Sequence, residues 1–176
     1  GNPVLRNAEV KLSETGTAGQ PSQYYFTTNQ KGFQLTFSGK VYSAGSIFME
    51  QLNSSDFTDL HTIIYGHNMK NGSMFAGLKN YSSPSYLVSH PTVYLDLADG
   101  THAYQIFSVY EAAADSDSYT IGFAPDEQYE EYLRTIKGRS EYDTGVDVTK
   151  DDFIITLSTC TRSGEDRYLV HAKKLW

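Results

Sequence analysis

The stretch FIITLSTCTRSGEDRYLVHAK, residues 153–173, contains two strand-like runs on either side of a polar loop. The first run ends at Cys160 and the second opens at Arg167, and the six residues between them include the turn-forming pair Ser163-Gly164. We predict an antiparallel hairpin in which Cys160 and Arg167 face each other. The Cβ atoms of residues directly opposite each other in such a ladder lie about 4.5–5.5 Å apart.

Cys160 is the single cysteine of the chain, so neither an internal disulfide nor a cysteine zinc cluster can form. A guanidinium fixed beside a thiol favours the thiolate and can donate to a developing oxyanion. Plainer interpretations compete with this one. A free cysteine is often a buried core residue, and Arg167 could form a rim ion pair with Glu165 or Asp166, worth about 0–1 kcal/mol. Arg162 is a competing cation on the same loop.

Five histidines are available as an acid–base partner for the thiol. His67 is the best candidate, because it lies at the junction between an apolar run and a loop, where barrel rims hold functional side chains. A histidine beside glycine at a strand end can equally be an ordinary surface residue. His171 would point to the same face of its strand as Arg167. It lies about 13 Å from Arg167 along that strand, which is too far to touch the thiol. The remaining three, without comparable context, are His61, His90 and His102.

Short apolar or alternating runs bounded by turn signals dominate the rest of the chain, which predicts a mostly β fold. One pair flanks Asp99-Gly100, a dipeptide suited to a tight hairpin turn. Two short helices are expected at 73–81 and 85–90, separated by Pro84. Together these features indicate an antiparallel barrel or sandwich with inserted helices. The expected strands are 23–26, 33–37, 45–49, 61–65, 93–97, 101–110, 153–159 and 168–173.

One longer helix is predicted from Pro125 to Gly138. Proline suits the first helical position, and the acidic residues that follow suit the positive end of the helix dipole. Its apolar stripe repeats at helical spacing, and Lys137 with Gly138 supplies the end signal. The stripe consists of Tyr129, Tyr132, Leu133 and Ile136.

The composition excludes several functions. A chain of 176 residues predicts one domain, and a net charge of −7 argues against nucleic acid as the main partner. No stretch approaches the roughly 20 apolar residues of a spanning helix. The acidic pairs Asp151-Asp152 and Asp115/Asp117 lack the spacing of a metal-binding loop, so no metal site and no cofactor are expected. Residues 1–22 are polar and weakly patterned.

Two motifs resemble those of a known family. Thr156-Leu157-Ser158-Thr159-Cys160, with Arg167 downstream, resembles the TLxTC…R signature of sortases. The segment IIYGHNM, residues 63–69, followed by NGSMF, residues 71–75, resembles the histidine segment of class B sortases. Residues 29–37 with GSIFM, residues 45–49, look like the stretch that precedes it. The resemblance covers residues 23–175 and identifies the chain as a member of class B.

The resemblance implies a closed eight-stranded β-barrel with inserted helices, including the long helix near 125–138. Residues 1–22 would be a divergent N-terminal segment and residues 23–176 the catalytic domain. In this family Cys160 would be the nucleophile, His67 the acid–base group and Arg167 the oxyanion stabiliser. Substrate-binding roles are expected for Ser158, Tyr65 and Asn29. One departure is the missing Gly-Trp-Leu/Ile segment, since the only tryptophan is Trp176.

The expected reaction cleaves a C-terminal sorting motif after threonine through a thioacyl enzyme. The acceptor would be an amine of a cell-wall precursor; alternatively a pilin lysine would serve, making the protein a pilin polymerase. A catalytically idle barrel that binds peptides is a third interpretation. The family also implies a location on the outer face of a Gram-positive cell membrane, with an anchoring segment before residue 1.

Overall fold

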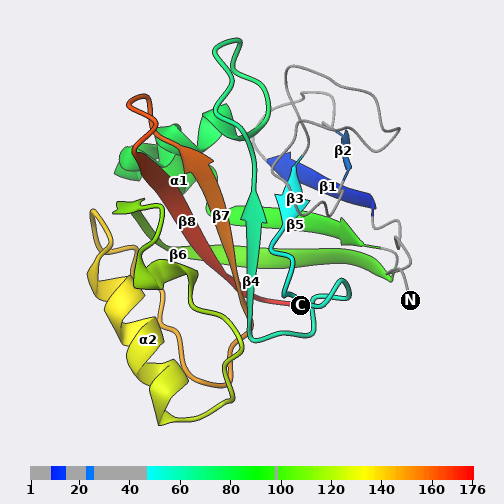
Figure 1. The fold of residues 1–176 in the computed structure, drawn as a ribbon, viewed down its shortest axis with the longest axis vertical. Helices are drawn as coiled ribbons and strands as arrows, with labels where there is room; N and C mark the ends of the chain where they lie inside the picture. Colours follow the sequence, from blue (N-terminus) through cyan, green and yellow to red (C-terminus); the bar gives the residue numbers. More distant parts are fainter. Residues whose placement is uncertain (1–8, 15–22, 26–46, 98) are drawn as a thin grey trace.

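The computed structural model describes residues 9–14, 23–25, 47–97 and 99–176. Its strands form one sheet in the order β2-β1-β5-β6-β8-β7-β4-β3 (Figure 1). The described ladders run from β2 to β3, so closure of the predicted barrel stays a prediction. The strands are β1 Glu9–Glu14, β2 Gln23–Tyr25, β3 Phe48–Met49, β4 His61–Tyr65, β5 Thr92–Leu97, β6 Gly100–Ala113, β7 Ile154–Cys160 and β8 Asp166–Lys174.

Strands β7 and β8 form the antiparallel hairpin that the sequence predicts, and both lie inside the sheet, with neighbours on either side. On its other side β7 pairs in parallel with β4, and His61–Tyr65 aligns with Ile154–Ser158. Figure 1 shows both arrows pointing to the same end of the molecule. Six of the seven residues of β7 are buried, because side chains cover the sheet on both faces. The C-terminal ends of β4 and β7 therefore meet at one rim.

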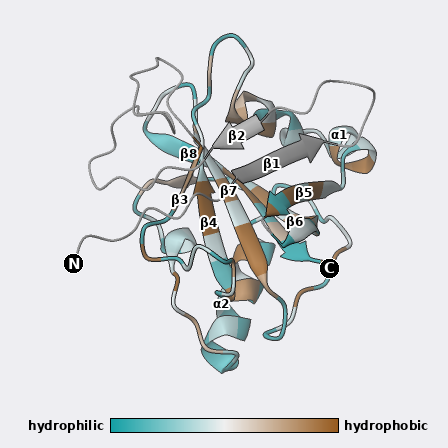
Figure 2. Cartoon of the chain, turned by 90° about the vertical axis from the view of Figure 1, so that its right-hand side faces the viewer, coloured by the Kyte–Doolittle hydropathy of each residue, from teal (hydrophilic) through white to brown (hydrophobic). Residues whose placement is uncertain are grey.

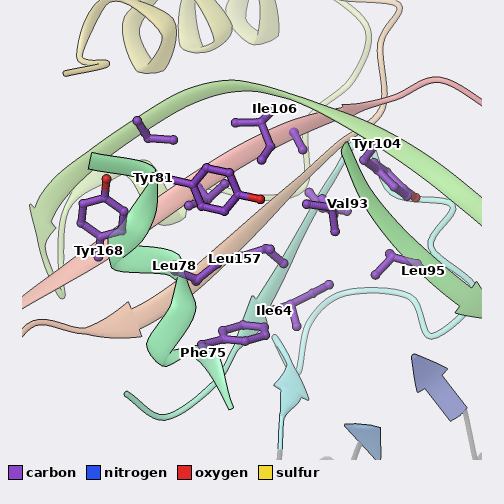
Figure 3. Packing of buried hydrophobic residues seen from close by; sticks show 14 of the residues in the cluster. Ile64, Phe75, Leu78, Tyr81, Val93, Leu95, Tyr104, Ile106, Leu157 and Tyr168 are labelled. Atoms are coloured by element: carbon purple, nitrogen blue, oxygen red, sulfur yellow. The ribbon is translucent and has the colours of Figure 1, made fainter. Parts of the chain in front are cut away.

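Two apolar cores cover the two faces of the sheet. The larger one packs the 3₁₀ helix η1, Phe75–Ser82, and helix α1, Pro84–Ser89, against the strands. Phe75, Leu78 and Tyr81 of η1 point toward strand residues such as Leu157 (Figure 3). Figure 2 shows the hydrophobic colour concentrated along the central strands. The second core lies between the sheet and helix α2, Glu127–Gly138.

Helix α2 begins two residues later than the sequence suggested. Pro125 was expected at the first helical position, but the helix starts at Glu127 with Asp126 as its N-cap. The Asp126 carboxylate accepts hydrogen bonds from the backbone N–H groups of Gln128 and Tyr129 at 3.0 and 3.2 Å. It thus satisfies two amides that the helix leaves unpaired, which outweighs the preference of proline for the first position.

The expected hairpin and the expected short helices are found, with some differences in their bounds. The hairpin around Asp99-Gly100 is confirmed by the pairing of β5 with β6. Pro84 does not separate two helices; it is the first residue of α1, where its missing N–H costs nothing. Of the strand expected at 45–49, residues 45 and 46 lie outside the described residues and β3 covers Phe48–Met49. The helix expected at 73–81 is the 3₁₀ helix η1.

The N-terminal segment contains one element that the sequence analysis did not predict. Strand β1 lies within residues 1–22 and pairs with both β2 and β5. The domain boundary at residue 22 stays a prediction. The strand expected at 33–37 lies outside the described residues. Across the described ranges, no helix is both long and apolar enough to cross a membrane.

Candidate active site

Cys160 and Arg167 face each other across the last hairpin, as predicted. Both are partly exposed at the rim, where β7 ends and β8 begins. The Arg167 Nη1 atom donates to the carbonyl oxygens of Gly164 and Asp166, each at 3.0 Å. These bonds hold the guanidinium on the loop between the two strands. Neither the buried-core interpretation of the cysteine nor a rim ion pair of Arg167 appears in the structure of this hairpin.

His67 lies on the opposite side of Cys160 from Arg167. The parallel ladder pairs Tyr65 with Ser158, and the Gly66 N–H donates to the Ser158 carbonyl at 3.0 Å. Continuing this register brings residue 67 beside residue 160, on a neighbouring chain about 4.8 Å away. Two-residue periodicity along β7 puts the Cys160 side chain on the same face of the sheet as that of Ser158.

Two contacts fix the loop that carries His67. The Asn68 side-chain amide donates to the Cys160 carbonyl at 2.9 Å, which ties the loop to the strand of the thiol. The Phe75 N–H donates to the His67 carbonyl at 3.0 Å. A Cβ atom at Gly66 would lie 2.6–3.0 Å from ring carbons of Phe75, so the ring needs glycine there. The backbone around His67 is therefore held from both sides.

A second row of side chains lies next to the thiol on the same face. Ser158 is 1% exposed, and its Oγ lies 2.8 Å from the Tyr119 hydroxyl. The Tyr65 ring stacks on Phe48 and on Tyr119, with centroids 5.1 and 6.1 Å away. A substrate-binding role is expected for Ser158, but its hydroxyl is buried and bonded to Tyr119. Contact of Ser158 or Tyr65 with a peptide stays a prediction, and Asn29 lies outside the described residues.

Tyr119 is a site residue that sequence reasoning missed. It belongs to a short 3₁₀ helix, η2, Asp117–Tyr119, in the connection between β6 and β7. Burial raises the pKa of its hydroxyl and Cys160 adds to that rise, whereas the hydrogen bond to Ser158 and the charge of Arg167 lower it. Tyr119 is thus close to the thiol and the guanidinium. The segment SDSY has no periodicity or motif that could have revealed this.

The pKa of the Tyr65 hydroxyl is also shifted. Burial, followed by a hydrogen bond to Glu50, raises its pKa above the ordinary range for tyrosine. The hydroxyl stays protonated and donates to Glu50 Oε2 at 2.8 Å. Tyr65 therefore contributes a neutral, fixed aromatic wall. In the part of the chain that the structure describes, no group of three or more His, Cys, Asp or Glu side chains could hold a metal ion.

The geometry combines a partly exposed thiol with an arginine opposite it in the ladder, and the loop of His67 is tied to the thiol's strand by Asn68. Such an arrangement suits nucleophilic catalysis on an acyl group, because the cation can stabilise both a thiolate and an oxyanion. A family model described as "Sortase domain" matches residues 34–175. The chain belongs to the sortase family.

Two curated relatives carry the name sortase B. The protein from Listeria monocytogenes is 44% identical over 117 residues, which cover 66% of this chain and 48% of that protein. The protein from Staphylococcus aureus is 32% identical over 166 residues, which cover 94% of this chain and 66% of that protein. The matched part therefore spans about half of the Listeria sortase and just under two thirds of the Staphylococcus sortase.

Solved sortase structures have the same fold. Sortase B from Listeria monocytogenes superposes with a TM-score of 0.82 at 34% identity, covering 95% of this chain and 94% of that one. A Staphylococcus aureus sortase B–substrate complex gives a TM-score of 0.84 at 29% identity, covering 95% of this chain and 79% of that one. The predicted membership of class B is confirmed.

Proposed function

We propose that the chain is a cysteine transpeptidase that cleaves a sorting-motif peptide and transfers its acyl part to an amine. The observation that supports the proposal is the pairing of Cys160 with Arg167 on β8, together with the bond from Asn68, the residue after His67, to the Cys160 carbonyl. Membership of the sortase family supports the same reaction class. A peptide-binding barrel without activity would need neither the thiol nor its flanking cation.

In the first half-reaction the Cys160 thiolate attacks the carbonyl carbon of a threonine in the sorting motif. The carbonyl oxygen becomes an oxyanion, which Arg167 stabilises by donating hydrogen bonds. The tetrahedral species collapses to a thioester as the C–N bond breaks. His67 in its protonated form gives its proton to the leaving amine.

In the second half-reaction an incoming amine attacks the thioester carbonyl. Neutral His67 takes a proton from that amine, and the collapse of the second tetrahedral species releases the Cys160 thiolate. The two half-reactions together need the thiolate of Cys160 and both protonation states of His67.

A peptide is the proposed partner, and the Staphylococcus aureus relative solved as a substrate complex supports it. Tyr119 and Tyr65 provide the aromatic surface beside the thiol, on the α2 side of the sheet. Two acceptors fit the chemistry: an amine of a cell-wall precursor, and the lysine of a pilin. Both place the protein on the outer face of a Gram-positive cell. We also infer that the sheet belongs to the eight-stranded barrel that the class implies.

The test uses fluorogenic peptides that carry several sorting motifs, with glycine-type amines or a lysine-bearing peptide as acceptors. Wild type should cleave at least one motif and form an amide with one acceptor class, and that class decides between anchoring and polymerisation. Cys160→Ala should be inactive on every motif. Identical traces from wild type and Cys160→Ala on all motifs would refute the enzymatic function.

A further inference from the structure

A chain of buried hydrogen bonds crosses the sheet beneath the thiol site. His171 on β8, Thr156 on β7 and His61 on β4 are each at most 1% exposed. Thr156 Oγ1 lies 2.7 Å from His171 Nδ1 and 2.7 Å from His61 Nε2. His61 Nδ1 lies 2.7 Å from the backbone carbonyl of Thr120. The chain therefore connects three strands to the residue that follows η2.

The carbonyl at its end fixes the direction of each bond in the chain. A carbonyl only accepts, so His61 Nδ1 must carry a proton. Burial lowers the pKa of His61 to about 4, so near pH 7 the ring is neutral and its Nε2 accepts. The Thr156 hydroxyl then donates to His61 and accepts from the Nδ1–H of His171. Each of the three hydrogen bonds therefore has a defined donor and acceptor, and the hydrogen bonds run in one direction from His171 to the Thr120 carbonyl by way of Thr156 and His61, with the His61 ring accepting at Nε2 and donating at Nδ1.

The same segment is held by helix α2 and by the residue after it. The Tyr132 hydroxyl donates to the Ser118 carbonyl at 2.8 Å. Arg139 donates to both carboxylate oxygens of Asp117, at 2.5 and 2.9 Å. That ion pair is exposed and contributes little by itself. The buried bond from His61 ties the segment to β4, beside the bond of the Tyr110 hydroxyl on β6 to Ser118 Oγ at 2.9 Å and that of Tyr119 to Ser158 on β7.

Tyr119 is the residue of η2 that reaches the thiol site. Its hydroxyl bonds to Ser158 and its ring stacks on Tyr65. Ser158 lies two residues before Cys160 on β7, on the same face of the sheet, so Tyr119 lies near the thiol. The carbonyl that His61 holds belongs to the next residue along the chain. A shift of this short segment would therefore move the ring of Tyr119 relative to the thiol.

We propose that His61 is a positioning residue of the thiol site: its buried bond to the Thr120 carbonyl holds η2 so that Tyr119 keeps its place beside Cys160. The inference rests on the proposed transpeptidase function. His61 lies beneath the site and acts through Tyr119. A displacement of about 1 Å near a reacting centre costs up to roughly 10²-fold in rate, so we expect about a tenfold loss of kcat/KM when the bond is lost.

A matched pair of variants isolates the bond. In His61→Asn the amide nitrogen occupies the place of Nδ1 and can still donate to the Thr120 carbonyl. In His61→Gln the amide reaches the place of Nε2 instead, and the bond is lost. Tyr132→Phe removes a single hydroxyl that holds η2 and is the variant least at risk of misfolding. Tyr129→Phe is the control, because its buried hydroxyl bonds to Leu60 and Asp152 and not to η2.

Two measurements on the whole protein decide the matter. Hydrogen exchange followed by mass spectrometry reports the stability of residues 117–120. Cleavage of a fluorogenic sorting-motif peptide gives kcat/KM for each variant, alone and combined with Tyr119→Ala. If His61 acts through Tyr119, the losses overlap, and His61→Gln costs little more once Tyr119 is alanine.

The expected result is faster exchange at η2 and about a tenfold loss of kcat/KM in His61→Gln, most of it recovered in His61→Asn. Tyr132→Phe should change both readouts in the same direction, and Tyr129→Phe should change neither. An unchanged exchange rate at η2 in His61→Gln overturns the inference. So does a double variant whose loss of kcat/KM is the product of the losses of His61→Gln and Tyr119→Ala alone. Failure of the proposed function gives a different result from failure of this inference. If the protein is not a transpeptidase, wild type matches Cys160→Ala on every peptide. The exchange rates of residues 117–120 still report whether His61 holds η2.

Discussion

At the scale of single residues, the proposed chemistry depends on where one guanidinium is held. Arg167 uses Nη1 to bind two loop carbonyls, at 3.0 Å each, and so keeps its position opposite Cys160. The remaining donors of a guanidinium can serve an oxyanion without moving the side chain. Arg162 lies exposed on the same loop but outside the β7–β8 ladder. Position in the ladder, rather than charge, distinguishes the two arginines.

We expect Arg167→Ala to lower kcat/KM for peptide cleavage by about 10²–10³-fold, the usual loss when an oxyanion donor is removed. Arg162→Ala, the matched control, should stay within about twofold, because an exposed charge contributes little. Arg167→Lys should recover only part of the activity, since an ammonium lacks the planar fork. Steady-state kinetics on one peptide measure all three. Equal losses from the two alanine variants would show that the wrong arginine was chosen.

The sequence was sufficient for Cys160 and Arg167 because both lie in one local hairpin. Tyr119 and His61 were not predictable, because their contacts join distant segments: Tyr119 meets a residue 39 positions away, and His61 meets one 95 positions away. No local pattern encodes such pairs. His61 was even set aside for lack of context, although it is fully buried in the hydrogen-bonded chain beneath the site.

At the scale of elements, the parallel pairing of β4 with β7 brings the loop that carries His67 to the strand that carries Cys160. The sequence predicted both strands but not their pairing, because parallel neighbours need a long crossover whose path has no local signal. Here the crossover contains η1, α1, β5, β6 and α2. The packing of Phe75 on Gly66 then fixes the chain just before His67.

Gly66→Ala should disturb this junction. The added Cβ would approach the Phe75 ring to 2.6 Å, so the ring or the backbone must move. We expect a loss of about 1–3 kcal/mol in the free energy of unfolding, typical of overpacking, together with reduced cleavage. Gly138→Ala is the matched control, because nothing lies within 4 Å of its added Cβ and it should not destabilise. Urea unfolding of the two variants measures the difference. A Gly66→Ala protein as stable as wild type would contradict the role given to this contact.

At the scale of the whole molecule, the two faces of the sheet are built differently. The face with η1 and α1 is an apolar core, whereas the face with α2 mixes apolar side chains with buried polar groups. On the α2 face the groups beneath the site are hydrogen-bonded in a chain, so they are stable only in defined protonation states. The stability of the entire domain is therefore linked to the titration of two buried rings.

Burial lowers the pKa of His61 to about 4, and burial, His61 and Arg139 lower that of His171 well below its usual value. An unfolded histidine titrates near 6.5, so the unfolded chain binds protons first as the pH falls. The free energy of unfolding should be greatest above pH 6.5 and decrease down to about pH 4, by on the order of 3 kcal/mol from His61 alone. Tyr132 on α2, which stays protonated throughout, does not contribute.

Urea unfolding between pH 4.5 and 7.5 measures this slope, and His61→Gln should reduce it because one titrating ring is removed. Asp117 has its pKa lowered by Arg139, so its contribution is lost only below its ordinary pKa of about 4, which lies below this window. Burial raises the pKa of Glu141, so its contribution has the opposite sign to that of the histidines. The loss of stability from the buried histidines therefore occurs at higher pH than the loss from Asp117. A wild-type stability that is constant between pH 4.5 and 6.5 would mean that both rings already accept protons in the folded state, and that the chain beneath the site is not buried as described.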